Sequence, residues 1–377
     1  MRQVRLGDFL EVQAGFAFKT EYFTSGDGMP LIRIRDLAKS QTEINYSGAY
    51  KPDFVVNNGD YLIGMDGNFR CYRWQGGASL LNQRVCRVRN FREGIEPDYV
   101  YYGIQRKLQE IEDTTSFMTV KHLSAKQVQN VEMPLPHLPE QRRIVDLLTR
   151  AEGIVRLRRE AEQKAAELIP ALFMDMFGDP ATNPKGWPAS SFGAVGVLDR
   201  GRSRNRPRDA KELYGGPYPF IQTGDVANSG GRITGYTATY SEAGLAQSRL
   251  WKRGTLCITI AANIAKTGVL EFDACFPDSV VGFLPGEQVR TAYVQAWLGF
   301  LQPTLEANAP QAAQKNINLE ILRNLPVPLP PLTLQETFEQ RCSDVISIQS
   351  QQAAATAKAQ ATFDALLAQV FHATKAS

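Results

Sequence analysis

Apolar residues recur every three to four positions in two long, otherwise polar stretches, residues 139–177 and 333–372. This period is that of one face of an α-helix, so each stretch is predicted to form a long helix. Gly153 and Pro170 weaken the interior of the first stretch, and a kink is expected near 166–170. Because the apolar face is narrow and rich in alanine, each helix needs one close partner, and the other long helix is the obvious candidate. At about 1.5 Å per residue, each helix would span roughly 60 Å and hold two globular domains apart.

Short runs with a strand-like pattern precede each long helix. They are rich in β-branched and aromatic residues and are bounded by Gly, Asn, Asp or Pro. Examples are GMPLIRI, GDYLIGM and RVCRVRN in the first half, and TLCITIA and SVVGFLP in the second. A helical stretch such as PDYVYYGIQRKLQEIE follows, and a proline-rich hinge, MPLPHLP or PVPLPPL, then leads into the long helix. This order of strands and helices predicts an α+β fold.

The two halves of the chain resemble each other at a nearly constant offset. The offset is 189 between segments 30–37 and 219–226 and 195 between 59–64 and 254–259, a drift that loop insertions within a repeated domain would produce. Residues related by an offset of 194 are Lys121 and Lys315, Pro134 and Pro328, Gln141 and Gln335, Leu172 and Leu366, and Phe177 and Phe371. We therefore predict a tandem duplication. Its expected parts are a first domain at 1–138, a central helix at 139–178, a second domain at 179–332 and a C-terminal helix at 333–377.

Composition narrows the class of protein. The 377 residues are too many for one typical domain, and 42 Lys and Arg against 39 Asp and Glu leave a net charge of only +3. Any nucleic-acid surface would therefore depend on local clustering. No apolar run of about 18 residues occurs and the N-terminus lacks the apolar core of a signal peptide, so no membrane partner is expected. Five cysteines without CxxC spacing and three distant histidines argue against a zinc site or disulfides, so a cytoplasmic protein is predicted.

Arginine gathers in one segment of each half. Residues 67–92 contain six arginines and no acidic residue, with Phe69, Tyr72 and Trp74 interleaved. The segment 200–211 carries Arg200, Arg202, Arg204, Arg206, Arg208 and Lys211 among Gly, Ser, Asn and Pro. Arginine grips phosphate and reads guanine with two parallel hydrogen bonds. A single charge run is usually solvated surface, but one run in each repeat favours nucleic-acid binding.

Polar residues at strand ends differ between the repeats. The tripeptide Asn82-Gln83-Arg84 occupies the position of Pro277-Asp278-Ser279, and Asn68-Phe69-Arg70 corresponds roughly to Asn263 and Lys266. Two domains that read different base sequences would differ at such positions. Neutral drift would produce the same difference, so both interpretations stay open.

Motifs for catalysis are missing from the sequence. It contains no GxxxxGK[ST], no GxGxxG after a strand, no HExxH, no GxSxG and no Asn-Pro-Pro-aromatic motif. The spacing of Asp53, Asp60 and Asp66 does not make a nuclease metal site, and turn capping explains these residues more simply. His122 and His137 lie beside the hinge and are expected to pack or to bond backbone there. A binding protein is therefore favoured over an enzyme.

At this point the layout resembles a known family, the specificity subunits of type I restriction–modification systems. The segments that carry the resemblance are PLIRIRDL (30–37), NNGDYLIG (57–64), MPLPHLPEQRRIVDLL (133–148), ELIPALFMDMFGDPATNPKGW (167–187), CFPDSVVGFLPG (275–286) and PVPLPPLTLQETF (326–338). The second copy departs from the first, because Thr333-Leu334-Gln335 replaces Pro-Glu-Gln and His372-Ala373 replaces Gly-Asp.

The resemblance implies a division of labour. Two target-recognition domains would each read one half of a bipartite, asymmetric double-stranded DNA sequence. The two long helices would pair as an antiparallel coiled coil that sets the gap between half-sites and docks the partners. Two methyltransferase subunits would use S-adenosylmethionine to methylate adenine, and ATP-driven motor–nuclease subunits would restrict unmethylated DNA. This chain would be non-catalytic and would need no cofactor.

The residues predicted to contact DNA lie in both halves. In the first half they are Lys19, Arg33, Arg35, Arg70, Asn82, Arg84 and Lys121, and in the second they are Arg200, Arg202, Arg204, Arg206, Lys211, Lys266 and Lys315. The arginines of 200–206 and Lys211 are expected mainly to contact phosphate. Three alternatives stay open. They are a coiled-coil scaffold without DNA specificity, an enzyme in its own right, and a specificity subunit of a related methylation-based defence system.

Overall fold

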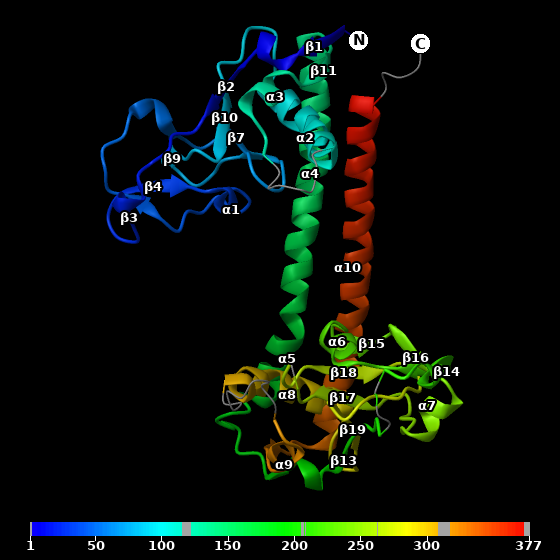
Figure 1. The fold of residues 1–377 in the computed structure, drawn as a ribbon. Coiled ribbons are helices and arrows are strands. Elements are labelled where there is room, and N and C mark those ends of the chain that lie inside the picture. The colour runs from blue at the N-terminus through cyan, green and yellow to red at the C-terminus, as the bar shows by residue number, and fades with distance from the viewer. Residues whose placement is uncertain are drawn as a thin grey trace. The chain divides into compact units, whose positions relative to one another are not determined.

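The computed structural model describes residues 2–114, 122–204, 207, 209–261, 263–307 and 317–372 (Figure 1). The chain forms two compact units. Unit 1 consists of Met1–Arg159 and Ala354–Ser377, and unit 2 of Glu160–Ala353. The two long helices contribute to both units, because α4 (Leu138–Ala166) and α10 (Leu332–His372) each cross the division. The domain limits expected from the sequence stay a prediction.

Unit 1 is built around an antiparallel sheet of four strands. In order they are β2 (Glu11–Ala14), β10 (Val85–Arg89), β7 (Tyr61–Gly64) and β8 (Cys71–Arg73). A second sheet has the order β3 (Phe23–Thr24), β5 (Asn45–Tyr46), β4 (Met29–Ile32), β9 (Ser79–Leu81) and β6 (Val55–Val56). A further pair joins β1 (Arg2–Arg5) to β11 (Glu132–Leu135). The shorter helices are α1 (Ile34–Leu37), α2 (Pro97–Thr114) and α3 (Ala125–Gln129).

Unit 2 repeats this plan. Its main sheet has the order β13 (Gly196–Arg200), β19 (Val280–Pro285), β17 (Leu256–Thr259), β18 (Thr267–Leu270) and β15 (Arg232–Ile233). Two strand pairs join β12 (Ala189–Ser191) to β20 (Pro326–Pro328) and β14 (Tyr214–Phe220) to β16 (Ala238–Tyr240). The helices are α5 (Leu168–Phe177), α6 (Thr223–Ala227), α7 (Glu242–Ala246), α8 (Thr291–Ala307) and α9 (Leu319–Arg323). The order β2-β10-β7-β8 of unit 1 thus recurs as β13-β19-β17-β18, as a duplication requires.

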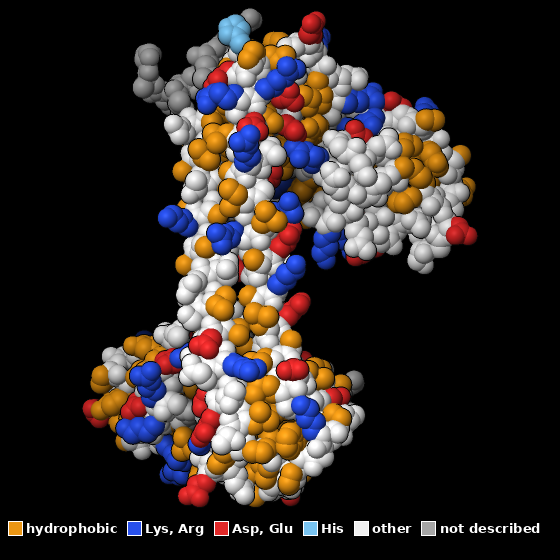
Figure 2. Space-filling model, turned by 180° about the vertical axis from the view of Figure 1, so that it is seen from behind, with side chains coloured by type: hydrophobic (Ala, Val, Ile, Leu, Met, Phe, Trp, Pro, Cys, Tyr) orange, Lys and Arg blue, Asp and Glu red, His pale blue; other side chains and the backbone are white. Residues whose placement is uncertain are grey.

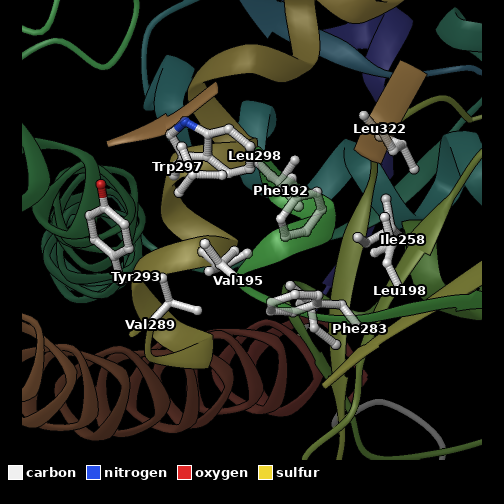
Figure 3. Close-up of a cluster of buried hydrophobic side chains, with 14 of the residues drawn as sticks. Phe192, Val195, Leu198, Ile258, Phe283, Val289, Tyr293, Trp297, Leu298 and Leu322 are labelled. Atoms are coloured by element: carbon white, nitrogen blue, oxygen red, sulfur yellow. The ribbon is translucent and has the colours of Figure 1, made fainter. Parts of the chain in front are cut away.

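Each unit encloses its own apolar core. In unit 2, Phe192 packs against Phe283 and Trp297, with ring centroids 4.6 and 5.2 Å away (Figure 3). In unit 1, Phe363 and Phe371 of α10 pack against the buried cluster that includes side chains of α2 and α4. All five cysteines are buried and form no disulfide, and Cys86 and Cys257 pack in apolar clusters as small apolar groups.

The long helices run antiparallel within each unit. In unit 1, Arg159 of α4 donates a 2.8 Å hydrogen bond to the Gln360 side chain of α10. In unit 2, Gln349 of α10 donates a 2.7 Å bond to the carbonyl oxygen of Ala165. Residue numbers therefore rise along α4 as they fall along α10. The helix predicted for 333–372 is confirmed, and so is its pairing with the first long helix.

The break expected in the first long helix is also present, because α4 ends at Ala166 and α5 begins at Leu168. Pro170 explains its position. Proline has no N–H to donate to the carbonyl four residues earlier, and its ring clashes with that carbonyl, which here belongs to Ala166.

A buried glutamine joins each long helix to its own unit. Gln141 and Gln335, which the 194-residue offset relates, are both fully buried. The Gln141 side chain accepts a bond from the Glu96 N–H (2.9 Å) and donates to the carbonyls of Gly94 (2.9 Å) and Pro136 (2.8 Å). The Gln335 side chain accepts from the Arg290 N–H (2.9 Å) and donates to the carbonyls of Gln288 (3.0 Å) and Pro330 (2.9 Å). All three partners are shifted by 194 residues, so the two copies share one joint, here called the glutamine joint.

An ion pair beside the glutamine joint is reversed between the copies. Arg142 of α4 lies 3.4 Å from the Glu96 carboxylate in unit 1. In unit 2 the equivalent positions hold Glu336 and Arg290, which also pair. The attraction has been kept while the two charges have exchanged places.

Candidate nucleic-acid interface

The arginines of residues 67–92, the unit 1 arginine run, are largely engaged within the protein. Arg87 is 9% exposed and bonds the Gln13 side chain (2.7 Å) and the carbonyls of Val55 and Asp53 (both 2.9 Å). Arg73 pairs with Asp98 of α2. Five of the six arginines of this segment, Arg70, Arg73, Arg84, Arg87 and Arg89, thus pair with acidic residues that lie outside it.

Arg89 illustrates the electrostatic consequence. It lies 2.7 Å from the Asp53 carboxylate and 3.1 Å from that of Glu11. Its hydrogen bonds lower the pKa of both carboxyl groups, and Asn90 adds a further bond to Glu11. The interleaved Phe69 and Trp74 are fully buried, so their rings pack in the core and offer no stacking surface.

The other candidates of unit 1 also have partners. Lys19 lies 3.5 Å from Glu21, and Arg35 lies 3.8 Å from Glu43. Arg33, mostly buried, bonds the Glu43 carboxylate at 2.9 Å and lies 3.5 Å from Asp36. The Arg70 side chain donates hydrogen bonds to the Gln109 side chain of α2 and to the carbonyl oxygen of the preceding residue, Phe69.

Asn82 and Arg84 lie on a tight turn between β9 and β10. The turn is held by a 2.9 Å bond from the Val85 N–H to the Asn82 carbonyl, and by close contact with Gly15. A Cβ at Gly15 would lie 2.0 Å from that carbonyl, so only glycine fits there. Arg84 is exposed and lies 2.9 Å from the Asp66 carboxylate.

The same carboxylate bonds a histidine. The second oxygen of Asp66 lies 2.7 Å from Nδ1 of His122. The sequence predicted that His122 would pack or bond backbone, and the structure corrects this by pairing the imidazole with a side chain 56 residues earlier in the chain. No local signal joins the two residues, because only the folding of unit 1 brings them together.

Residues 200–211, the unit 2 arginine loop, differ from the unit 1 arginine run in the exposure of their arginine side chains. Arg200 ends β13 and is half-buried, and the Gly-Arg-Ser-Arg sequence that follows alternates strictly. Gly201 and Ser203 are buried, whereas Arg202 and Arg204 are exposed. A Cβ at Gly201 would lie 2.2 Å from the Phe276 carbonyl, so the close approach requires glycine.

Backbone contacts hold this loop in place. The N–H of Arg202 bonds the Phe276 carbonyl at 3.0 Å, and the Arg202 carbonyl accepts from Ser248 at 2.8 Å. Within the described residues, the Arg202 and Arg204 side chains make no hydrogen bond or ion pair. Their guanidinium groups therefore face solvent with all donors available to a phosphate.

Two further lysines of unit 2 are exposed. Lys211 begins a short 3-10 helix, and Lys266 lies in the turn between β17 and β18. Arg206, Lys121 and Lys315 lie outside the described residues, as does Arg208.

Sequence reasoning missed Arg249, which stacks 3.8 Å above the Trp251 ring and pairs with Asp199. Asp199 lies in β13, 50 residues earlier in the chain, so no local sequence motif indicates this pair.

Acidic and basic side chains are interspersed over the face of the molecule in Figure 2, in keeping with the small net charge. Among the described residues, no group of three or more His, Cys, Asp or Glu is placed to hold a metal ion. No helix in this part of the chain combines the length and apolarity that a membrane span requires.

Comparisons with known proteins agree on one family. A model described as the type I restriction modification DNA specificity domain matches residues 1–167 and 184–355. The EcoBI specificity subunit of the type I restriction enzyme of Escherichia coli is 26% identical over 403 residues, which covers 98% of this chain and 85% of that protein.

Solved structures share the fold. A chain described under "Structural basis underlying complex assembly and conformational transition of the type I R-M system" aligns with a TM-score of 0.61 at 21% identity, covering 98% of this chain and 97% of that one. The S subunit of a type I restriction–modification system from M. genitalium aligns with a TM-score of 0.53 at 13% identity, covering 98% and 96%. With both halves of its sequence matched by the family model, the chain belongs to the family of type I restriction modification DNA specificity domains.

Proposed function

We propose that this chain is the non-catalytic subunit that gives a type I restriction–modification complex its sequence specificity, and that each unit reads one half of a bipartite, asymmetric double-stranded DNA target. The observation that carries the proposal is the duplication within the family match, because both halves align with the DNA specificity domain. Two copies in one chain can diverge, so the target need not be a palindrome as it is for a symmetric dimer.

Affinity would come chiefly from phosphate contacts. In unit 2 we assign these to Arg200, Arg202, Arg204, Arg206, Lys211, Lys266 and Lys315. In unit 1 the candidates for contact with DNA, to phosphate or to bases, are Lys19, Arg33, Arg35, Arg70, Asn82, Arg84 and Lys121. The free side chains of Arg202 and Arg204 support a phosphate role most directly, since no internal partner within the described residues competes for them. Phosphate contacts position a protein on the duplex, and side chains at loop tips then read base edges.

The helix pair gives the proposal its geometry. We expect α4 and α10 to set the number of unspecified base pairs between the half-sites. Once one half-site is bound, the second contact becomes nearly intramolecular. Two DNA methyltransferase subunits and the motor–nuclease subunits of the complex are the expected partners, with docking along the helices.

Sequencing of the methylated bases in cells that carry this chain with its methyltransferase subunits tests the proposal. The expected result is one motif with two specified halves separated by a fixed number of unspecified positions. Cells with the methyltransferase subunits but without this chain are the control and should lack the motif.

Two other outcomes would decide against the proposal. An assembled complex that enriches no bipartite motif from random duplexes would favour a coiled-coil scaffold without DNA specificity. Turnover of S-adenosylmethionine by the purified chain alone would identify it as an enzyme.

A further inference from the structure

The cluster formed by Asp66, Arg84 and His122 occupies an edge of unit 1 that has an exact backbone counterpart in unit 2. In unit 1 the Met65 N–H bonds the Arg84 carbonyl at 2.9 Å, and the Leu123 N–H bonds the Met65 carbonyl at 2.7 Å. In unit 2 the corresponding bonds are Ile260 N–H to Ser279 carbonyl at 3.0 Å and Ile317 N–H to Ile260 carbonyl at 3.0 Å. Offsets of 195, 195 and 194 residues relate Met65, Arg84 and Leu123 to these positions.

These bonds align the side chains of the two edges. Arg84 corresponds to Ser279, and Asp66, which follows Met65, corresponds to Ala261, which follows Ile260. The edge of unit 1 thus holds an arginine paired with a carboxylate, whereas neither of these two positions in unit 2 carries a charge. A shared framework with unlike side chains is what two domains that select different bases require.

The geometry of Arg84 suits base recognition more than phosphate binding. Its Nη1 lies 2.9 Å from the Asp66 carboxylate, which restrains the guanidinium while the side chain stays 55% exposed. Within the described residues, Nε and Nη2 have no partner, so one two-donor edge of the guanidinium remains open. Guanine presents two acceptors, N7 and O6, in the major groove, and arginine is its commonest partner there.

His122 adds to the same edge. Nδ1 of His122 lies beside the Asp66 carboxylate, so in the neutral imidazole Nδ1 carries the proton and Nε2 can accept a hydrogen bond. The imidazole is about as exposed as Arg84. The half-buried Asp66 carboxylate therefore contacts both Arg84 and His122.

We propose that Arg84, held by Asp66, reads a guanine in the half-site recognised by unit 1, which makes Arg84 a specificity-determining residue and Asp66 a positioning residue. The inference rests on the proposed function and deepens it, because it names the base and the residues for one half-site.

The test compares methylation motifs for the whole complex carrying Arg84→Ala, Arg84→Lys or Asp66→Asn. For Arg84→Ala, the preference for guanine at one position should fall about tenfold or more, in one half-site only. Arg84→Lys keeps the charge but loses the two-donor edge, so it should relax the same position with little loss of overall affinity. Asp66→Asn should weaken the guanine preference while binding to random DNA is kept or rises, a combination that a merely structural role would not produce.

Two control variants accompany these. Arg106 is also 55% exposed and also pairs with a carboxylate, that of Glu110 on the same helix, so Arg106→Ala should leave the motif unchanged. Ser279→Ala should leave the half-site that depends on Arg84 unchanged. An unaltered motif for Arg84→Ala, or equal loss in both half-sites, would overturn the inference. A wild-type complex that selects no motif at all would instead overturn the proposed function, and the inference with it.

Discussion

The unit 1 arginine run and the unit 2 arginine loop look alike in sequence and differ in the folded protein. In unit 1, Arg73, Arg87 and Arg89 each bond carboxylates or carbonyls from distant segments. In unit 2, Gly201 packs closely against the Phe276 carbonyl, and the exposed side chains of Arg202 and Arg204 have no partner among the described residues. An arginine-rich segment is therefore no measure of a DNA surface by itself, since acidic residues elsewhere in the fold decide whether its charge stays available.

The largest expected effect is on the free energy of unfolding, and it tests whether Arg87 of unit 1 and Arg202 of unit 2 differ in role. Arg87→Met removes a nearly buried guanidinium and leaves the Val55 carbonyl oxygen and the Gln13 side-chain oxygen without this donor. Such a loss should cost about 3 kcal/mol of unfolding free energy. Arg202→Met should change it by less than about 0.5 kcal/mol. Denaturant unfolding of both variants measures the difference, and equal effects would show that the two arginines have the same role.

A second prediction concerns what the two units share. Gln141→Leu and Gln335→Leu each remove three hydrogen bonds between a fully buried glutamine side chain and the backbone. Each should lower the free energy of unfolding by roughly 2 kcal/mol, because a hydrogen bond contributes about 0.5–1.5 kcal/mol net. Gln351→Leu on the exposed face of α10 is the matched control. A clear loss in one unit and none in the other would mean that the glutamine joint is not equivalent in the two copies.

A third prediction concerns the free arginines. The double variant Arg202→Ala and Arg204→Ala should weaken DNA binding roughly tenfold or more, since two charged contacts to phosphate are lost. The slope of log affinity against log salt should fall by about 0.9 for each phosphate contact removed. The measurement is DNA affinity over a series of salt concentrations. The control is Arg73→Ala with Arg89→Ala in unit 1, whose salt slope should stay unchanged, and a parallel fall in both variants would contradict the contrast.

The smallest expected effect concerns the ion pair beside the glutamine joint, whose two charges are exchanged between the units. Exchanging the charges in unit 1, by Glu96→Arg with Arg142→Glu, should recreate the arrangement of Arg290 and Glu336. Each single change should be less stable than the double variant, with a coupling of about 0.2–1 kcal/mol for an exposed pair. A double-mutant cycle measures the coupling, and a value of zero would mean that the pair contributes nothing in unit 1.

Much of the fold was accessible from the sequence. The repeat found by comparing Gln141 with Gln335 corresponds to a physical joint, although its hydrogen bonds were not foreseen. Thr333 and Leu334 replace Pro139 and Glu140 in the second copy, yet Gln335 alone makes the three side-chain hydrogen bonds of the joint. The break near Pro170 was predictable because proline removes a hydrogen bond wherever it occurs in a helix.

The candidate interface was accessible only in part. The sequence predicted clustered arginines in both halves, and it treated the two clusters alike. It did not indicate that the Asp66 carboxylate would lie beside both Arg84 and His122, which follow it by 18 and 56 residues in the chain.

By itself, the sequence determined the duplication, the two long helices and the places where arginine gathers, because periodicity, proline and repetition act over a few neighbouring residues. Which of those arginines pair with acidic residues and which make no described side-chain contact depended on the tertiary structure, as did the position of the Asp66 carboxylate beside Arg84. The physical reason is that ion pairs act over a few ångströms of space, and folding brings together charges that the chain keeps tens of residues apart.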